Sequence, residues 1–243
     1  MSDGEITVTG MVLSATPVSD YDKRLVILTK ERGKITAFAR GARRPGSSML
    51  AASNPFAFGE FTIYPGRNAY TAAKAHITEY FRDLAIDYEA ACYGFYFLEV
   101  AEYYSRENED DRELLKLLYI TINVLSQKRL AFKTLQHIFE LRMLAVNGES
   151  PNLTGCVKCN KKENLHYFNA GHGGLVCDDC VAKIGGNTIS QSALYTMQYV
   201  VTSPLTKLYT FTLTPEVEKE FFAHVDSLKK VFMRHPFKSL DVI

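Results

Sequence analysis

The sequence lacks the short motifs that mark many enzymes. Its 243 residues contain no phosphate-binding G-x-x-x-x-G-K-[ST] loop, no G-x-S-x-G nucleophile motif and no H-E-x-x-H metal-binding motif. They contain no run of eighteen apolar residues that would cross a membrane. Residues 1–5 carry no basic segment ahead of an apolar stretch, as a secretory signal would. These absences argue against an enzyme and favour a cytoplasmic protein with no membrane association.

The chain also has almost no net charge, at +1, but its charge is unevenly distributed. Residues 23–44 hold eight basic side chains and one acid, Glu31, a local net charge of +7. A basic patch on one element is the footprint expected of a nucleic-acid surface, whereas a solvated hairpin face is the plainer alternative. The residues predicted to contact DNA are Arg24, Lys30, Arg32, Lys34, Arg40, Arg43, Arg44 and, further along the chain, Arg67 and Lys74.

Residues 40–48 form an Arg- and Gly-bearing loop directly after a predicted strand. Glycines let a backbone approach phosphates closely, and guanidinium groups grip phosphate oxygens in a fork. Because Gly41 precedes Arg43 and Arg44 and Gly46 follows them, we expect a flexible loop that presents both side chains outward. Four aromatic residues could stack on bases, although more of them are expected in the core: Phe38, Phe56, Phe58 and Tyr64.

The N-terminal third is predicted to be a small β-barrel. Five short strands are expected at residues 6–13, 24–29, 35–39, 56–64 and 70–77, with turns at 31–34 and 65–68. A five-stranded barrel of this size is typical of the oligonucleotide-binding (OB) fold. The number of strands alone does not separate it from an SH3-like barrel.

The rest of the chain is mainly helical. Helices are predicted at residues 88–104, 114–125, 132–146, 190–201 and 215–233. Asn147-Gly148 ends the third of these, and Thr214 followed by Pro215 begins the last. The predicted fold is therefore α+β, with an OB-type barrel over 1–78, a helical domain over 79–150 and 183–243, and a cysteine-rich zinc element inserted at 151–182.

Four of the five cysteines stand as C-x2-C, seventeen residues, C-x2-C: Cys156, Cys159, Cys177 and Cys180. Two such pairs make a tetrahedral all-sulfur site that suits Zn²⁺, and a closed site of this kind is structural. A redox dithiol or four unrelated buried thiols are the alternatives. No βαβ pattern accompanies the pairs, as a redox C-x-x-C would require, and unrelated thiols give no reason for the doubled spacing.

The residues between the cysteine pairs are predicted to form a hairpin. Residues 165–168 favour a strand, 170–174 a turn and 175–176 a second strand that leads into Cys177. With four cysteines available as ligands, His166 and His172 are expected on the hairpin surface. The fifth cysteine, Cys92, lies in an apolar helical run and is expected to pack as a small hydrophobic residue.

Several phrases stand in a specific order. Gly33-Lys34 comes first, followed by ARGARR at 39–44, FELRML at 139–144 and NGESPNL at 147–153, which leads into Cys156 and Cys159. This order resembles the RecO family of bacterial recombination mediators. The resemblance covers most of the chain.

The resemblance implies an OB barrel, a helical domain and a zinc element. It implies binding of single- and double-stranded DNA, annealing of complementary strands, and help in loading recombinase onto strands covered by single-strand DNA-binding protein. Implied partners are RecR and the acidic C-terminal tail of that single-strand binding protein, in a cytoplasmic, nucleoid-associated protein. Some members lack the cysteines, so zinc is not required for the family's activity. A candidate receptor for the tail comprises Lys128, Arg129, Leu130, Phe132 and Lys133.

Two other classes of function remain open from the residues alone. One is a zinc-ribbon adaptor that binds only proteins. The other is a nuclease whose carboxylates follow no known motif. DNA binding at two salt concentrations separates the first from a DNA-binding protein, and incubation of DNA with Mg²⁺ or Mn²⁺ tests the second.

Overall fold

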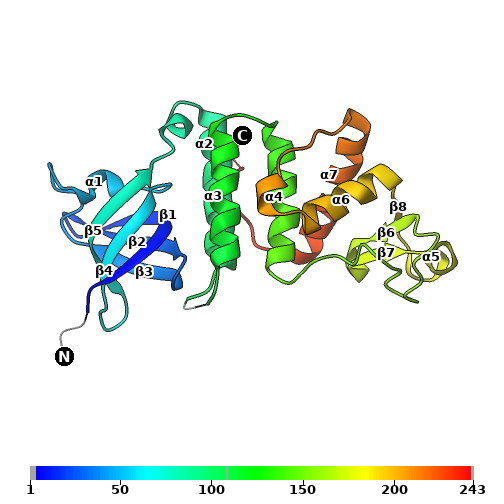
Figure 1. The fold of residues 1–243 in the computed structure, drawn as a ribbon, viewed down its shortest axis with the longest axis horizontal. Helices are drawn as coiled ribbons and strands as arrows, with labels where there is room; N and C mark the ends of the chain where they lie inside the picture. Colours follow the sequence, from blue (N-terminus) through cyan, green and yellow to red (C-terminus); the bar gives the residue numbers. More distant parts are fainter. Residues whose placement is uncertain (1–3, 108, 242–243) are drawn as a thin grey trace. The chain divides into compact units, whose positions relative to one another are not determined.

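The computed structural model describes residues 4–107 and 109–241. The chain divides into two compact units, one comprising Met1–Gln127 with Phe237–Ile243 and the other Lys128–Pro236 (Figure 1). The helices predicted as one domain are thus distributed over both units, and the domain boundaries given above stay a prediction. Within the described part of the chain, no helix combines the length and apolarity needed to cross a membrane.

The first unit begins with a closed five-stranded barrel. Its strands are β1 (Ile6–Val18), β2 (Asp22–Thr29), β3 (Gly33–Ala39), β4 (Phe58–Tyr64) and β5 (Tyr70–Glu79). They follow one another in the order β1-β2-β3-β5-β4, and β4 pairs back onto β1. Every pairing is antiparallel except that of β3 with β5. This five-stranded barrel is of the OB type and confirms the predicted architecture.

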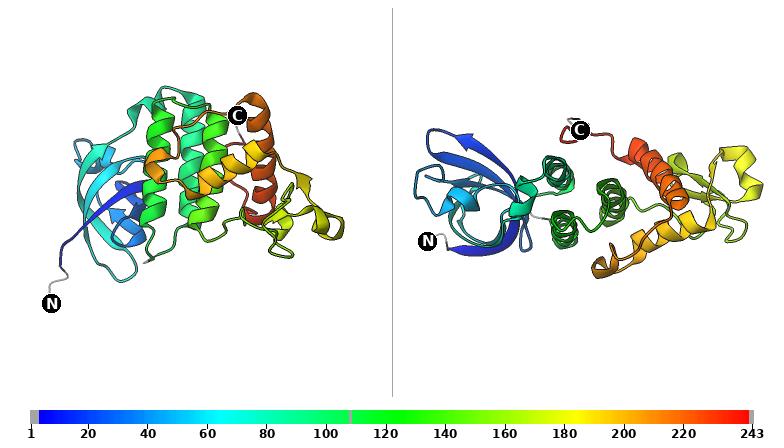
Figure 2. Two further views of the ribbon diagram at one scale, coloured as in Figure 1. Left: turned by 45° about the vertical axis from the view of Figure 1, so that its right-hand side comes forward. Right: turned by 90° about the horizontal axis from the view of Figure 1, so that it is seen from above.

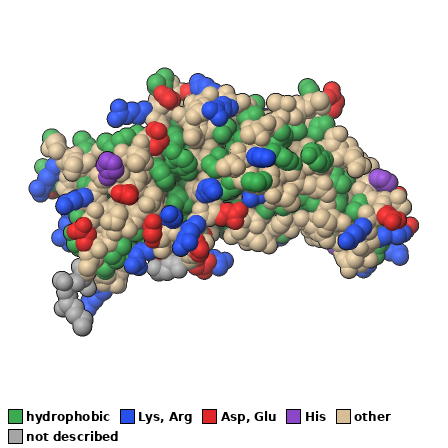
Figure 3. All heavy atoms as spheres, in the orientation of Figure 1, with side chains coloured by type: hydrophobic (Ala, Val, Ile, Leu, Met, Phe, Trp, Pro, Cys, Tyr) green, Lys and Arg blue, Asp and Glu red, His purple; other side chains and the backbone are tan. Residues whose placement is uncertain are grey.

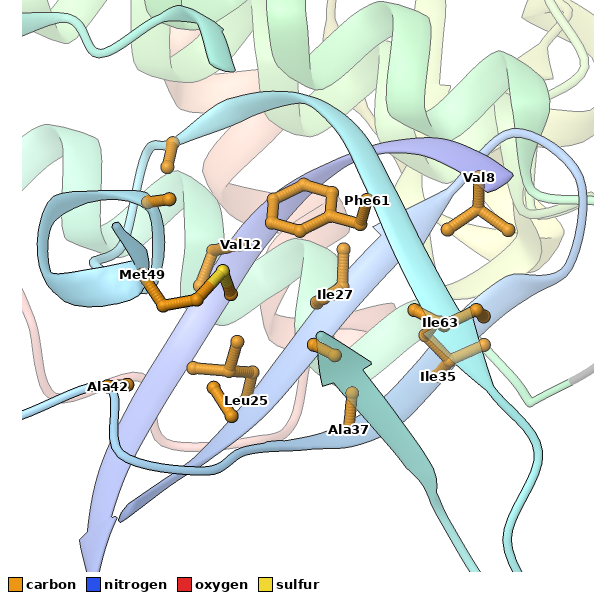
Figure 4. Close-up of a cluster of buried hydrophobic side chains, with 14 residues drawn as sticks. Val8, Val12, Leu25, Ile27, Ile35, Ala37, Ala42, Met49, Phe61 and Ile63 are labelled. Carbon is orange, nitrogen blue, oxygen red and sulfur yellow. The ribbon is translucent and has the colours of Figure 1, made fainter. Parts of the chain in front are cut away.

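Strand alternation fills the barrel with apolar side chains, as Figure 4 shows for Val8, Leu25, Ile27, Phe61 and Ile63. A four-residue helix that the sequence did not predict, α1 (Met49–Ala52), contributes both of its end residues to the same cluster. Ala42 also lies there, fully buried. Residues 43–46 of the 40–48 loop are exposed, as expected, whereas Ala42 fixes the start of the loop in the barrel core.

Two helices complete the first unit beside the barrel: α2 (Tyr88–Tyr104) and α3 (Arg112–Ser126), preceded by the 3₁₀ turn η1 (Arg82–Ala85). They run side by side in both views of Figure 2. α2 has the predicted bounds and is capped by Asp87, whose side chain accepts a hydrogen bond from the Ala90 amide. The ring of Phe58 on β4 packs 4.5 Å from that of Tyr119 on α3.

The β2–β3 hairpin fits closely against the connection between α2 and α3. Gly33 has φ +59°, and a Cβ placed on it would lie 2.3 Å from the Glu109 carbonyl oxygen and 2.9 Å from that of Arg106. The Lys34 amide donates to the same Arg106 oxygen at 3.1 Å. Gly33 is thus required by the close approach of two backbones as well as by the turn.

The second unit contains α4 (Phe132–Val146), α6 (Gln191–Thr202), η3 (Leu205–Lys207) and α7 (Pro215–Phe232). Glu140 of α4 is fully buried and accepts hydrogen bonds from Gln136 Nε2 and Lys229 Nζ, each at 2.8 Å. The remainder is the cysteine element: β6 (Tyr167–Asn169), η2 (Ala170–His172), β7 (Gly174–Val176), α5 (Asp178–Ile184) and β8 (Asn187–Thr188). The predicted hairpin is confirmed as β6–β7, and β8 adds a third strand to it.

Replacing Gly33 by Ala is expected to lower the free energy of unfolding of the first unit. The loss should exceed the roughly 1–2 kcal/mol that a left-handed backbone costs a non-glycine residue, because the added Cβ also collides with two carbonyl groups. Gly46→Ala is the matched control, since Gly46 has φ +79° and open space around it. Denaturant unfolding measures both variants. Equal losses would show that the close approach to Arg106 and Glu109 contributes nothing.

Candidate metal centre and nucleic-acid interface

The four predicted cysteine ligands lie together. Their Sγ atoms are all within 4.8 Å of one another, and those of Cys159 and Cys177 are 3.7 Å apart. Tetrahedral zinc with bonds of about 2.3 Å separates its sulfurs by roughly 3.8 Å. All four are free thiols, three of them buried and Cys159 exposed. The geometry and the donor set fit a single metal ion.

The two C-x2-C pairs are built on different turns. In the first pair, the Cys156 amide donates to the Lys161 carbonyl, and the turn passes through Asn160 at φ +60°. In the second, Cys177 is the N-cap of α5 and Cys180 lies in its first turn. The same spacing therefore serves a loop in one case and the start of a helix in the other. The sequence predicted the pairs but not α5.

The surroundings of the cysteines favour the thiolate form of Cys156 and disfavour the thiolate forms of Cys177 and Cys180. Burial acts to raise the pKa of the Cys156 thiol, but backbone amides of Cys177, Lys158 and Cys159 lower that pKa to about 6. Burial raises the pKa of Cys180 to about 12 and also raises that of Cys177. A bound cation is what would allow all four sulfurs to be thiolates at neutral pH.

A polar network ties the cysteine element to α7. The Glu220 carboxylate accepts hydrogen bonds from the Ser190 amide and hydroxyl, each at 2.6 Å. Buried His224 packs the edge of its ring against Phe168, with centroids 5.2 Å apart. Burial lowers the pKa of His224, against the opposing charge of Glu220. Ser190 is also the N-cap of α6, so the network joins three elements of the second unit.

The histidines between the cysteine pairs lie where the sequence placed them. The His166 ring contacts the Asp178 carboxylate at 2.9 Å, and its side chain is 66% exposed. His172 is exposed as well. Neither belongs to the metal-binding group, which comprises the four cysteines.

One group of predicted DNA contacts lies at the end of the barrel that carries the β1–β2 turn. Arg43 Nη1 donates to the Ser19 carbonyl at 3.3 Å, and the Arg44 guanidinium lies 5.2 Å from the Tyr21 ring centre. Arg24 pairs across the strands with Phe38. The arginines of this group are all exposed: Arg24, Arg40, Arg43 and Arg44.

A second group surrounds the β2–β3 hairpin. A cavity of about 220 Å³ lies between this hairpin and the β4–β5 turn, and Lys34 and Arg67 both line it. Arg32 reaches Tyr70, with its Nη1 3.4 Å from the phenol oxygen. Lys34 Nζ donates to the Glu102 carbonyl at 2.6 Å, so this ammonium also fastens the hairpin to α2. Exposed Lys30 lies at the hairpin tip. Lys74 lies on β5, opposite Thr62 of β4, and belongs to neither group.

The four aromatic candidates differ in their exposure. Phe56 is buried with its ring centre 4.9 Å from that of Phe95, and Phe58 packs on Tyr119 as described. The Tyr64 hydroxyl donates to the Glu5 carboxylate at 2.6 Å. Phe38 is 36% exposed on the outer surface of β3. Phe38 is therefore the member of this set best placed to stack on a base.

Sequence reasoning missed two cations of α3. The Nε atom of Arg112 donates to the Lys30 carbonyl at 3.1 Å, across 82 residues of sequence, and Lys116 lies one helical turn further on. A count of charges within a sequence window cannot bring these residues together with the hairpin. The i, i+4 spacing of Arg112 and Lys116 is the one signal that could have drawn attention to them.

Two family models together match almost the whole chain. "Recombination protein O N terminal" matches residues 1–81, and "Recombination protein O C terminal" matches residues 86–241. The chain belongs to the RecO family. The resemblance drawn from the order of sequence phrases is thereby confirmed.

Curated RecO relatives align over most of their length. "DNA repair protein RecO" of Alkaliphilus metalliredigens is 35% identical over 176 residues, 72% of each chain. Its namesake from Clostridium acetobutylicum is 29% identical over 96% of this chain and 95% of the relative. That of Acetivibrio thermocellus is 27% identical over 97% and 92%. This chain is a RecO-family DNA repair protein.

His224→Gln is expected to flatten the dependence of stability on pH. Because the folded protein holds the pKa of His224 below its unfolded value of 6.5, the unfolded chain takes up this proton first as pH falls. Stability is therefore fully present above about pH 6.5 and is lost as pH falls from there through the folded pKa. Thermal unfolding of both proteins between about pH 7.5 and 5 measures the difference.

His76→Gln is the control for this comparison, because His76 is exposed on β5 in the first unit. Its pH dependence should match that of the unaltered protein. If His224→Gln also retains the full pH dependence, the acid sensitivity arises elsewhere and His224 does not contribute.

Proposed function

We propose that this RecO-family protein binds single- and double-stranded DNA through its barrel and anneals complementary strands. The observation that supports this best is the exposed arginine group around the β1–β2 turn, formed by Arg24, Arg40, Arg43 and Arg44. Ala42 and Met49 anchor the segment that carries Arg43 and Arg44. Anchored guanidinium groups lose less freedom on binding a phosphate than groups on a loose loop would lose.

The proposed mechanism needs no covalent step and no nucleotide hydrolysis. Two complementary strands repel each other, and a positive surface lowers that repulsion and concentrates both strands. Bases held loosely on an aromatic platform remain free to pair. Phe38 provides such a platform between Arg24 and the start of β5, since it pairs with Arg24 on one side and Thr71 on the other.

We also propose that the protein helps to load recombinase onto strands covered by single-strand DNA-binding protein, with RecR as a partner. The acidic tail of the single-strand binding protein would meet exposed Lys128, Arg129 and Lys133 beside Leu130 and Phe132. Titration of a labelled acidic peptide against the unaltered protein and against Lys133→Glu tests that receptor, and the variant should bind the peptide more weakly. An affinity equal to that of the unaltered protein would place the receptor elsewhere.

We infer that the ion held by the four cysteines is Zn²⁺ in a structural role. Soft thiolates select zinc, and four protein ligands leave no vertex for a reacting water. The ion would hold the two C-x2-C turns together, which the small β6–β7–β8 sheet alone does little to stabilise.

Protein purified without chelator is expected to contain one zinc per chain by elemental analysis. Cys177→Ser should lose that zinc and lower the unfolding temperature of the second unit, because metal-binding energy becomes folding energy. Cys92→Ala is the control, since Cys92 lies in α2 of the first unit and should leave the zinc content unchanged. Absence of stoichiometric zinc from the unaltered protein would contradict the inference.

The protein is expected to speed annealing of complementary oligonucleotides without ATP and to leave them uncut. The double change Arg43→Ala with Arg44→Ala should weaken DNA binding regardless of base sequence. Each lost phosphate contact makes the plot of log affinity against log salt shallower by about 0.7 for single strands, hence about 1.4 for both. Fluorescence titration at several salt concentrations measures this slope.

Lys207→Ala with Lys219→Ala is the matched control, since both lysines are exposed in the second unit. It should bind DNA as the unaltered protein does. An arginine variant with unchanged affinity and slope would move the interface to Lys30, Arg32 and Lys34. No DNA binding by any protein would favour the adaptor, and cleavage with Mg²⁺ or Mn²⁺ would favour the nuclease.

A further inference from the structure

An aromatic cavity lies in the first unit, between the barrel and α3. It has a volume of about 270 Å³, and Thr9, Phe58, Leu115 and Tyr119 form its floor and walls. This is slightly below the roughly 300–1,000 Å³ of pockets that hold drug-sized ligands. The cavity therefore suits one ring of a larger ligand.

The two rings in this cavity are held in place. Phe58 and Tyr119 have centroids 4.5 Å apart at an interplanar angle of 45°. Tyr119 also contacts the ring of Phe81, with centroids 5.8 Å apart. A ring fixed on two sides loses little freedom when a third ring stacks on it. The cavity is thus prepared for a flat aromatic group.

Three cations surround the same cavity: Lys30, Arg112 and Lys116. The Arg112 side chain is anchored by its hydrogen bond to the Lys30 carbonyl yet stays 64% exposed. Three acids lie nearby. Asp110 is 3.5 Å from the Arg112 Nε atom and 70% exposed, Glu31 accepts a hydrogen bond from the Thr9 amide at 2.8 Å, and exposed Glu60 on β4 pairs with Thr9. The lining itself carries the three cations and no acid.

Helix α3 places these features in register. Arg112 and Lys116 are four residues apart, as are Leu115 and Tyr119, so the cations form one row and the apolar side chains the next. Figure 3 shows Lys and Arg side chains at the lower end of α3 beside the barrel, with hydrophobic side chains continuing above them. The arrangement is an aromatic floor with a cationic edge.

We propose that this cavity is a subsite for one nucleotide of a DNA single strand. Its base stacks on the Tyr119–Phe58 pair, and its flanking phosphates lie against Lys30, Arg112 and Lys116. The proposal rests on the DNA binding proposed above and extends it, because the strand would continue from the barrel onto α3. Lys30 belongs both to the hairpin group of predicted DNA contacts and to the lining of this cavity, and this continuity favours a strand over an acidic peptide with an aromatic side chain.

A subsite of this kind should distinguish single strands from duplexes by affinity. Bases in a duplex are stacked on one another and cannot enter a cavity of one-ring size without unpairing. Phosphates alone can still meet the rim. The cavity residues should therefore contribute more to single-strand affinity than to duplex affinity.

The test uses a double variant that carries both Arg112→Ala and Lys116→Ala, and compares its DNA binding with that of the unaltered protein. Single-strand affinity should fall severalfold, and the salt slope should become shallower by about 1.4 if each side chain meets one phosphate. Duplex affinity should change less. Both side chains are exposed, so thermal unfolding should change little. Lys116→Ala alone leaves the hydrogen bond from Arg112 to Lys30 intact and should still weaken single-strand binding. Lys207→Ala with Lys219→Ala again serves as the control.

A second measurement reports on the base itself. A single strand carrying 2-aminopurine should lose fluorescence when its base stacks in the cavity, and Tyr119→Leu should restore part of that signal. An unchanged signal in Tyr119→Leu would overturn base stacking on this residue. The charge variants keep the test decisive if Tyr119→Leu proves unstable.

The remaining outcomes are distinguishable. If Arg43→Ala with Arg44→Ala weakens DNA binding but the α3 variant binds like the unaltered protein, the subsite is overturned and barrel binding stands. If neither the unaltered protein nor any variant binds DNA, the proposed DNA binding by the barrel fails as well. If the α3 variant keeps its DNA affinity but loses binding of a labelled acidic peptide, the cavity belongs to a protein partner.

Discussion

The backbone contact between Gly33 and the carbonyls of Arg106 and Glu109 determines where the two cavities beside the β2–β3 hairpin can form. It presses the tip of the β2–β3 hairpin onto the α2–α3 connection, and Lys34 reinforces it through the Glu102 carbonyl. Hydrogen bonding then brings Lys30 to Arg112. The cavity beside Arg67 and the aromatic cavity beside Tyr119 both depend on this position of the hairpin.

The cations of this unit fall into two kinds with different consequences. Lys34 is committed to the fold, because its ammonium satisfies a backbone carbonyl at 2.6 Å. Arg43 and Arg44 touch the β1–β2 turn yet remain exposed, so they retain donors for another ligand. Removing a cation of the first kind would perturb structure and binding together. A mutation series that treats all the basic residues alike would confuse these effects.

Periodicity along the sequence was enough to predict the barrel strands, α2 and α4, and cysteine spacing was enough to predict which four cysteines lie together. Two of the misses, α1 and the contact between Arg112 and Lys30, share one cause, which is that distant contacts decided them. α1 is a helix of four residues whose Met49 and Ala52 complete a core made by other strands. Arg112 meets Lys30 across 82 residues. Neither local propensity nor a charge window contains that information.

The parallel pairing of β3 with β5 has a consequence for the order of folding. Antiparallel β1, β2 and β3 can form as soon as residues up to Ala39 are available, but closure must wait for β4 and β5. Until then β1 and β3 each present an unpaired edge, which can template association with another chain. Long-range closure of this kind is slow relative to hairpin formation. Conditions that delay it during synthesis would therefore expose the chain to aggregation before any binding surface exists.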